Sequence, residues 1–247
     1  MPAIKFKGVD FIEFDTLLND DERLVRDTAR KFIEDNLIPI IEECNRAGRF
    51  PRELVKPMAD LGFFGASLQG YGCAGMGNVE YGLVTQELER GDSGVRSFVS
   101  VQSALVMYPI YAFGSDEQKK KFFPRLAKGA ISAFALTEVD AGSDPANMRT
   151  HAEPTPDGKY YILEGEKLWC TNGTRAELFV VMARTPDAVV NGKTRKQITA
   201  FIVEASWPGV EVVHRCRFMG LKAIENGVIR FNRVRVPREN ILWEEGR

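Results

Sequence analysis

Residues 134–144 read FALTEVDAGSD. The segment begins with the alternation of a half-buried strand, in which Phe134 and Leu136 face one side and Thr137 faces the other. It then gives way to Asp140–Asp144, a turn of small residues with free backbone N–H groups. Because such a turn lets the backbone approach closely, it can hydrogen-bond an anionic phosphate or pyrophosphate. Taken alone, the same residues would more simply form an ordinary turn.

A second segment, residues 167–173, reads KLWCTNG and follows after one insert of hairpin size, residues 151–166. It places the indole of Trp169 two residues before the hydroxyl of Thr171. If strand alternation continues, both side chains point the same way. A flat aromatic wall beside a hydroxyl suits a planar heterocycle with polar edges. Alone, the segment would be a strand with Trp169 in the core. The two segments together, in this order and at this separation, predict a ligand site.

The chain changes character near residues 129–132. Before them, apolar residues recur at helical spacing, with an acidic helix start at Asn19–Glu22 and a capping box at Ser115–Gln118. Pro39 would bend or shorten the first helix. These patterns predict helices at residues 20–41, 52–61, 79–90, 95–113 and 119–128.

After Ser132 the segments are short, rich in branched and aromatic residues, and bounded by turn residues. Residues 155–158 and 191–192 are plausible hairpin tips. A helical half followed by a strand half predicts the α+β class, with a helical domain at 1–131 and a β-domain at 132–247. The predicted strands are residues 131–137, 160–164, 178–184, 198–204, 210–215 and 228–236.

Composition excludes several classes of protein. The 33 basic and 34 acidic residues nearly cancel, so nothing suggests a nucleic acid or an anionic membrane as partner. The four cysteines are far apart and the two histidines form no motif with them, which argues against a metal site and a disulfide framework. The N-terminus resembles neither a secretory signal nor a transit peptide, and no stretch is long and apolar enough to span a bilayer. We expect a soluble, cytoplasmic protein.

Together, the two segments resemble the flavin-binding signature of the acyl-CoA dehydrogenase family, and the likeness extends along nearly the whole chain. The resemblance implies a helical N-terminal domain, an antiparallel barrel-like or sandwich-like middle domain, and a C-terminal helical bundle that has no counterpart here. Residues 236–242 look like the family's exit from the middle domain. The resemblance also implies FAD as cofactor, acyl-CoA as substrate, electron-transferring flavoprotein as partner, and a homotetramer for the complete enzyme.

Carried over by position, the resemblance implies roles for individual residues. Trp169 covers one face of the flavin ring, Thr171 hydrogen-bonds near flavin N5, and Ser143 reaches the pyrophosphate or the acyl-CoA phosphates. Val139 replaces the family's usual proline. The full implied cofactor set is Phe134, Leu136, Thr137, Gly142, Ser143, Trp169, Cys170 and Thr171. Within it, Cys170 replaces a branched aliphatic residue, and its side chain is expected only to pack away from the site.

The resemblance implies no catalytic base in this chain. The family's reaction removes an α-proton from an acyl thioester while the β-hydrogen leaves as hydride to the flavin, and a desolvated carboxylate takes the proton. In the family that carboxylate belongs to the C-terminal domain. Glu138 lies near the flavin motif but matches a scaffold position. We therefore expect this chain alone to be inactive, and Leu83, Val84, Leu105 and Val106 to form an exposed patch that promotes association.

The substrate is suggested by a second resemblance, to glutaryl-CoA dehydrogenases, in residues 87–97, 100–103 and 70–75. It implies that Arg96 binds the distal carboxylate of a diacid substrate, since a guanidinium binds carboxylates bidentately. The implied substrate set is Arg96, Glu89, Ser97, Ser100 and, at the phosphates, Ser143.

Other interpretations stay open. Arg96 could pair with Glu89 or Asp92 for structural reasons alone. Residues 219–222 and 227–230 look more like simple fatty acyl-CoA dehydrogenases. An acyl-CoA oxidase would use the same flavin cradle but admit dioxygen. A flavin- or acyl-CoA-binding fragment without catalytic activity is the remaining, non-enzymatic alternative.

Overall fold

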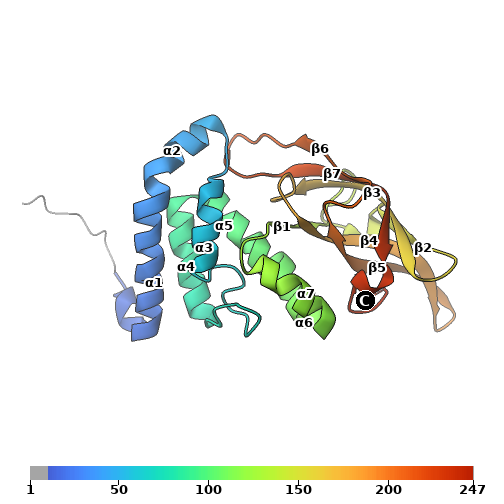
Figure 1. The fold of residues 1–247 in the computed structure, drawn as a ribbon, viewed down its shortest axis with the longest axis horizontal. Helices are drawn as coiled ribbons and strands as arrows, with labels where there is room; N and C mark the ends of the chain where they lie inside the picture. Colours follow the sequence, from blue (N-terminus) through green and yellow to red (C-terminus); the bar gives the residue numbers. More distant parts are fainter. Residues whose placement is uncertain (1–10, 247) are drawn as a thin grey trace, which may run out of the picture.

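A computed structural model describes residues 11–246. The helices form one side of the molecule and a twisted sheet forms the other, so the α+β class is confirmed (Figure 1). The α-helices are α1 (Asp20–Phe32), α2 (Ile38–Ala47), α3 (Val55–Asp60), α4 (Asn78–Gly91), α5 (Ser93–Ser100), α6 (Tyr108–Phe113) and α7 (Asp116–Leu126).

The predicted helix starts are present as capping interactions. Asn19 and Glu22 form a reciprocal capping box at α1, and Ser115 and Gln118 form another at α7. Asp92 lies between α4 and α5. Its side chain accepts a hydrogen bond from Val95 N at 2.9 Å and so caps α5. Each interaction satisfies backbone donors that a helix N-terminus leaves unpaired.

Two π-helical turns interrupt the long helices, and the sequence did not predict them. The first, η2 (Ile33–Leu37), joins α1 to α2 directly before Pro39. Because Pro39 has no N–H for the carbonyl one turn earlier, the regular hydrogen-bond ladder cannot continue there, and the helix changes direction (Figure 1). The second, η4 (Val101–Met107), joins α5 to α6.

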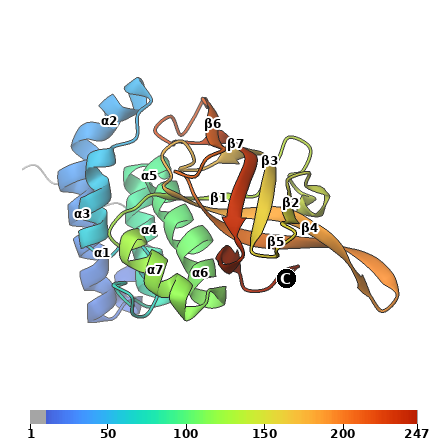
Figure 2. The same ribbon diagram turned by 45° about the vertical axis from the view of Figure 1, so that its right-hand side comes forward.

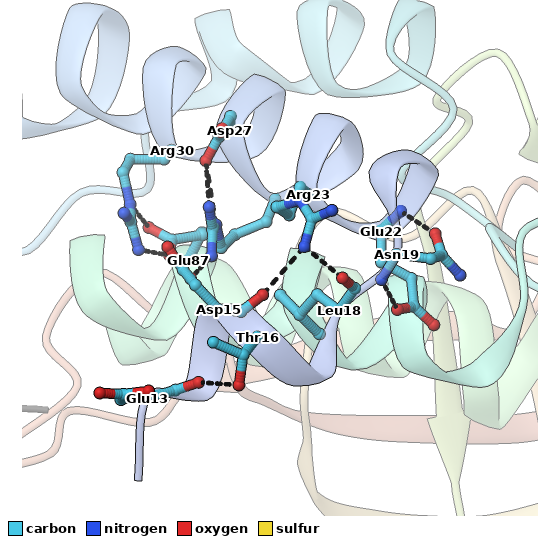
Figure 3. Close-up of polar contacts among 11 residues, drawn as sticks. Glu13, Asp15, Thr16, Leu18, Asn19, Glu22, Arg23, Asp27, Arg30 and Glu87 are labelled. Atoms are coloured by element: carbon cyan, nitrogen blue, oxygen red, sulfur yellow. Dashed lines mark hydrogen bonds and ion pairs between the residues drawn. The ribbon is translucent and has the colours of Figure 1, made fainter. Parts of the chain in front are cut away.

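Helices α1 and α4 are held together by a buried carboxylate. Glu87 is only 1% exposed and accepts hydrogen bonds from Arg30 at 2.7 and 3.2 Å (Figure 3). Arg90 binds the same carboxylate at 2.8 Å. Burial would raise the pKa of Glu87, but its hydrogen bonds and the two guanidinium charges outweigh burial and lower it. Glu87 therefore stays ionised, and it fixes the pairing of the two helices.

The strands form a single sheet in the order β6-β7-β3-β2-β4-β5-β8, with β1 paired beside β4. The strands are β1 (Ser132–Ala135), β2 (His151–Pro154), β3 (Tyr160–Cys170), β4 (Leu178–Val190), β5 (Lys193–Glu204), β6 (Val210–Arg215), β7 (Gly227–Pro237) and β8 (Ile241–Leu242). The predicted turn at 155–158 joins β2 to β3. The predicted turn at 191–192 joins β4 to β5, and that hairpin extends away from the helices (Figure 2).

The expected antiparallel β-domain is present as an open sheet. The sheet is mostly antiparallel, but β1 pairs with β4 in parallel, as does His151 of β2 with Arg184. Strands β6 and β8 each pair with one neighbour, so the sheet stays open. Closing a barrel would need those two edges to meet, and β8 is only two residues long.

The buried apolar side chains form two cores, and alternation along the central strands places neighbouring residues in different ones. The first core lies between the helices and the sheet, and the second is formed by residues of the β half alone. Leu178 and Val180 of β4 face the helices, whereas Phe179 and Val181 face the second core. The same alternation holds in β1, where Ala133 and Ala135 lie in the second core and Phe134 packs against the helices.

The expected exposed patch was mostly wrong. Leu83, Val84 and Val106 are buried because the helices pack on one another, and of that set only Leu105 is exposed, at 43%.

Candidate functional site

The two sequence motifs lie side by side. Strand β1 ends at Ala135, two residues earlier than predicted. The chain nevertheless stays paired, because Thr137 O accepts a hydrogen bond from Leu168 N at 2.7 Å. Leu136 O accepts a second one from Lys167 Nζ at 2.9 Å. The fold thus brings the start of the KLWCTNG segment against the end of the FALT strand.

The turn after Glu138 presents free backbone donors. Glu138 and Ala141 close it with reciprocal backbone hydrogen bonds at 3.0 and 3.4 Å. Beyond them Gly142, Ser143 and Asp144 are exposed. Within residues 11–246, the N–H groups of Gly142 and Ser143 have no acceptor. A Cβ at Gly142 would meet no atom within 4 Å, so the turn has room for a ligand to approach the backbone.

Trp169 is exposed rather than in the core. The residue is 56% exposed, and its backbone has a φ of +56°, a left-handed conformation that is rare for a bulky residue. The pairing of β3 with β7 shifts register between Lys167 and Cys170. The simpler interpretation of Trp169 as a core residue is therefore wrong.

Strand alternation also does not set the direction of Thr171. Strand β3 ends at Cys170, and Thr171 lies in the following turn. Cys170 is 2% exposed and belongs to the second core, where burial raises the pKa of its thiol to about 12. Its side chain is therefore out of reach of a ligand. Only the backbone of Cys170 could contact the cofactor, as the implied cofactor set requires.

Glu138 forms a buried ion pair with Lys167, whose side chain is fully buried. The carboxylate lies 2.8 Å from Lys167 Nζ and also accepts hydrogen bonds from the backbone of Arg149 and Thr150 at 2.6 and 3.0 Å. Burial would raise the pKa of Glu138, but these contacts outweigh it and hold that pKa below its usual range. Burial lowers the pKa of Lys167. A carboxylate that is pinned and hard to protonate is a poor proton acceptor, so Glu138 belongs to the scaffold.

Arg96 is paired as the structural alternative supposed. Its Nε lies 2.6 Å from Glu89, which also accepts a hydrogen bond from Ser93 at 2.5 Å. Burial raises the pKa of Tyr81, while its hydrogen bond with Ser100 and the charge of Arg96 oppose the rise. Tyr81 therefore joins this cluster, and the sequence interpretation missed it.

The guanidinium of Arg96 still has N–H groups that could bind a second carboxylate. Its side chain is 37% exposed, and Glu89 is its only ionic partner among residues 11–246. Asp92 is engaged in capping α5, and Ser97 is half-buried on the same helix. The cluster keeps a guanidinium accessible to a second carboxylate.

An open cleft of about 310 Å³ lies beside the ion pair but is not the face of the indole. It is lined by residues 138–140, 149–151 and 164–168, and neither Trp169 nor Ser143 borders it. Within residues 11–246, no cluster of three or more His, Cys, Asp or Glu side chains could hold a metal ion. None of the helices described is both long and apolar enough to cross a membrane.

Comparison with known proteins decides the family. The N-terminal domain of acyl-CoA dehydrogenases matches residues 19–130, and the middle domain matches residues 133–234. The chain belongs to the acyl-CoA dehydrogenase family. The probable acyl-CoA dehydrogenase FadE10 of Mycobacterium bovis is 47% identical over 219 residues, which make up 88% of this chain and 33% of that protein.

Solved structures of the family have the same fold. A glutaryl-CoA dehydrogenase from Mycobacterium smegmatis in complex with FADH2 is 43% identical with a TM-score of 0.87, over 95% of this chain and 58% of that one. Butyryl-CoA dehydrogenase from Megasphaera elsdenii is 34% identical with a TM-score of 0.84, over 93% of this chain and 60% of that one. This member of the family thus spans only part of the length of each of these relatives.

Proposed function

We propose that this chain holds FAD and forms the flavin-binding part of an enzyme that oxidises the α,β carbon–carbon bond of an acyl-CoA. The observation that carries this is the contact between the two motifs at Thr137 and Leu168, 2.7 Å from O to N. The contact places an exposed indole and a turn with free N–H groups on two adjoining segments. Both features suit a planar ring with an anionic tail.

FAD supplies the hydride acceptor when bound. The chain's own residues would bind and orient it: Trp169 against one ring face, the Thr137 backbone and hydroxyl at an edge, and Thr171 near the reacting nitrogen. The N–H groups of Gly142 and Ser143 would bind pyrophosphate oxygens. We assign no base for the α-proton, because Glu138 already binds three donors and has a lowered pKa. The 247 residues alone are therefore expected not to turn over an acyl-CoA.

The test of cofactor binding is direct. The purified chain is mixed with excess FAD, separated from free flavin by gel filtration, and examined by visible absorption. We expect a flavin spectrum that elutes with the protein and is shifted from that of free FAD. A chain that leaves the column colourless at every flavin concentration would contradict the proposal and favour a fragment that binds no flavin.

We further propose that the substrate is a diacid thioester of the glutaryl class. The accessible guanidinium of Arg96, set among Glu89, Tyr81 and Ser100, supports this, since a charged anchor inside an acyl site favours a charged tail. The second candidate is a simple acyl-CoA. The tight pairing of Arg96 with Glu89 favours it, because a guanidinium that is already paired gains less from binding a substrate carboxylate.

The remaining proposals concern the complete enzyme. From the family we infer electron-transferring flavoprotein as electron acceptor, and a homotetramer. An oxidase is distinguished by its reoxidation: after anaerobic reduction, rapid reaction with dioxygen would indicate an oxidase, whereas preference for electron-transferring flavoprotein would indicate a dehydrogenase. An assay of the 247-residue chain with FAD and an artificial acceptor tests the expected inactivity.

A further inference from the structure

The π-turn η4 buries polar side chains deep between the helices and the sheet. Val101, Gln102 and Ser103 are consecutive, yet all three are buried. A π-turn holds about one residue more per turn than an α-helix, and such turns occur often at functional sites. Ser103 uses its position to accept a hydrogen bond from Gly65 N at 3.0 Å. Gln102 points toward the sheet and reaches the first residue of β1.

The Gln102 amide is used to capacity. Its Nε2 donates to Leu126 O at 3.2 Å and to Ala130 O at 2.8 Å. Its Oε1 accepts from Ser132 N at 2.9 Å and from Ser132 Oγ at 2.7 Å. Two donors and two lone pairs are all that an amide offers, so Gln102 is held in one orientation.

Asn172 binds the same serine from the other side. Its backbone is left-handed, with a φ of +66°, and its side chain is 2% exposed. The Nδ2 atom donates to Ser132 O at 3.0 Å and to Phe98 O at 3.3 Å. The backbone N–H, carbonyl and hydroxyl of Ser132 are therefore all engaged by two buried amides. We refer to Gln102, Ser132 and Asn172 as the Ser132 hub.

Each member of the hub adjoins a different segment of the proposed site. Ser132 begins the strand that leads to Phe134 and Thr137. Asn172 directly follows Thr171. Gln102 lies two residues after Ser100, on the continuous helix that carries Arg96. In a buried network of this kind each hydrogen bond polarises and stiffens the others, so the three segments are held in a fixed spacing.

We propose that Gln102, Ser132 and Asn172 are positioning residues: they set the distance between the two flavin-binding segments and the helix that faces the substrate. This inference rests on the proposed binding of FAD. The hub itself touches neither ligand and acts through Phe134, Thr171 and the Arg96 helix.

Gln118 provides a matched control. It is also a buried amide in a helix of the same layer, and its Nε2 donates to Glu239 O at 2.7 Å and Ile241 O at 2.8 Å. It therefore also joins the helices to the β half of the chain. Neither carbonyl belongs to a proposed flavin segment. A loss of Gln118 should cost comparable stability without moving the site.

The experiment compares Gln102→Leu, Ser132→Ala and Asn172→Ala with Gln118→Leu in the 247-residue chain. FAD affinity is measured by flavin fluorescence at a temperature where thermal melts show every variant folded. We expect the hub variants to bind FAD about tenfold more weakly, since one to two hydrogen bonds that hold the site are lost, and Gln118→Leu to bind within about twofold of the parent. The double variant Gln102→Leu with Asn172→Ala should lose less than the product of the single losses, because both act through Ser132.

Two outcomes separate the inference from the proposal beneath it. If the parent chain binds no FAD, the proposed function fails. The role of the hub is then tested by the NMR shifts of the indole N–H groups in the flavin-free protein. Hub variants should shift the Trp169 resonance and Gln118→Leu should shift that of Trp243. If the parent binds FAD but hub and control variants lose affinity in proportion to their melting temperatures, the hub is structural only and the inference is overturned. Ser132→Ala, which removes only one hydroxyl, keeps the test open should Gln102→Leu not fold.

Discussion

Trp169 combines an exposed indole with a left-handed backbone, two features that lower the stability of a fold unless a ligand or partner covers them. A bulky residue in that backbone region carries on the order of 1–3 kcal/mol of strain. Trp243 matches it closely, since it is 53% exposed, has a φ of +67° and stacks on Phe113 at 5.4 Å. Comparing substitutions of Trp169 and Trp243 therefore separates the loss of a ligand contact from the relief of backbone strain.

We predict that Trp169→Ala weakens FAD binding about tenfold, because a stacked aromatic face is lost, while Trp243→Ala leaves it within about twofold. Flavin fluorescence titration measures both. Equal losses in the two variants would show that Trp169 does not contact the ring.

Lys167 and Glu138 should be the most sensitive ion pair. We predict that Lys167→Met lowers the free energy of unfolding by about 3–5 kcal/mol, because it leaves a carboxylate buried without its cation. Adding Glu138→Gln should recover part of that loss. Lys31→Met, at an exposed i,i+4 pair, should leave it nearly unchanged. Denaturant unfolding checks all three.

The ion pair of Glu138 and Lys167 also predicts how the stability of the fold depends on pH. Because the folded-state pKa of Glu138 is lowered, its ionisation stabilises the fold fully above the ordinary carboxyl pKa of about 4.3 and loses that effect as the pH falls through the folded value. The stability difference between the parent and Glu138→Gln should therefore be constant near neutral pH and shrink below about pH 4. A difference that persists at lower pH would contradict this.

Arg96 decides the substrate class. If it binds a distal carboxylate, Arg96→Met should weaken binding of glutaryl-CoA by about 1.5–3 kcal/mol and leave butyryl-CoA unaffected, since a charged hydrogen bond is lost for one ligand only. Arg90→Met is the control, because Arg90 and its partner Glu87 both lie on α4, the helix before that of Arg96. Calorimetric titration that finds equal losses for both thioesters would assign Arg96 to structure.

At the scale of the elements, much could be predicted from local pattern. The capping boxes at Asn19 and Ser115, the break at Asp92 and the two hairpin turns all follow from side-chain chemistry within a few residues. The π-turns themselves were not predicted: Pro39 indicated a bend but not its π-helical form, and the partners of Gln102 lie in a distant part of the chain. Alternation predicted the two faces of β1 correctly but misled at Trp169, where a register shift ends the strand pattern. Gln102 and Lys167 gave no local signal, since their partners lie about thirty residues away.

Gly165 controls how β2 approaches β3. Its φ is +150°, and a Cβ there would lie 2.6 Å from the Cα of Thr150. We predict that Gly165→Ala destabilises the protein by about 2–4 kcal/mol through overpacking and backbone strain. Gly158→Ala, in a turn with a φ of +67° and no atom within 4 Å, should lose only about 1–2 kcal/mol from the backbone. Thermal melts that rank the two in the opposite order would contradict the close approach.

Across the whole molecule, an apolar stripe remains uncovered. Leu105, Tyr108 and Phe113 are each more than 40% exposed along η4 and α6, and Trp243 extends the stripe from the end of the sheet. Contiguous exposed apolar surface favours association. The stripe replaces the patch expected from sequence and shares only Leu105 with it.

We predict that the chain self-associates through this stripe and that Leu105→Glu with Tyr108→Glu weakens association by about tenfold or more, since central apolar contacts dominate such interfaces. Val189→Glu, at an exposed valine of the β4–β5 hairpin away from the stripe, should leave association unchanged. Sedimentation velocity over a concentration series measures each constant. A double variant that associates as the parent does would exclude the stripe.

The π-turn at Val101–Met107 has a consequence for how this gene can vary. Because the turn contains about one residue more than an α-helix of the same rise, loss of a single codon there would let the helix regularise while α5 and α6 keep their orientations. Elsewhere in the helices, the same deletion would rotate everything that follows by about 100° and move apolar side chains out of the core. A natural one-codon deletion in this stretch should therefore yield a protein that still folds cooperatively, with a melting temperature lowered about as much as by Gln102→Leu, because the inward hydrogen bonds of Gln102 are lost.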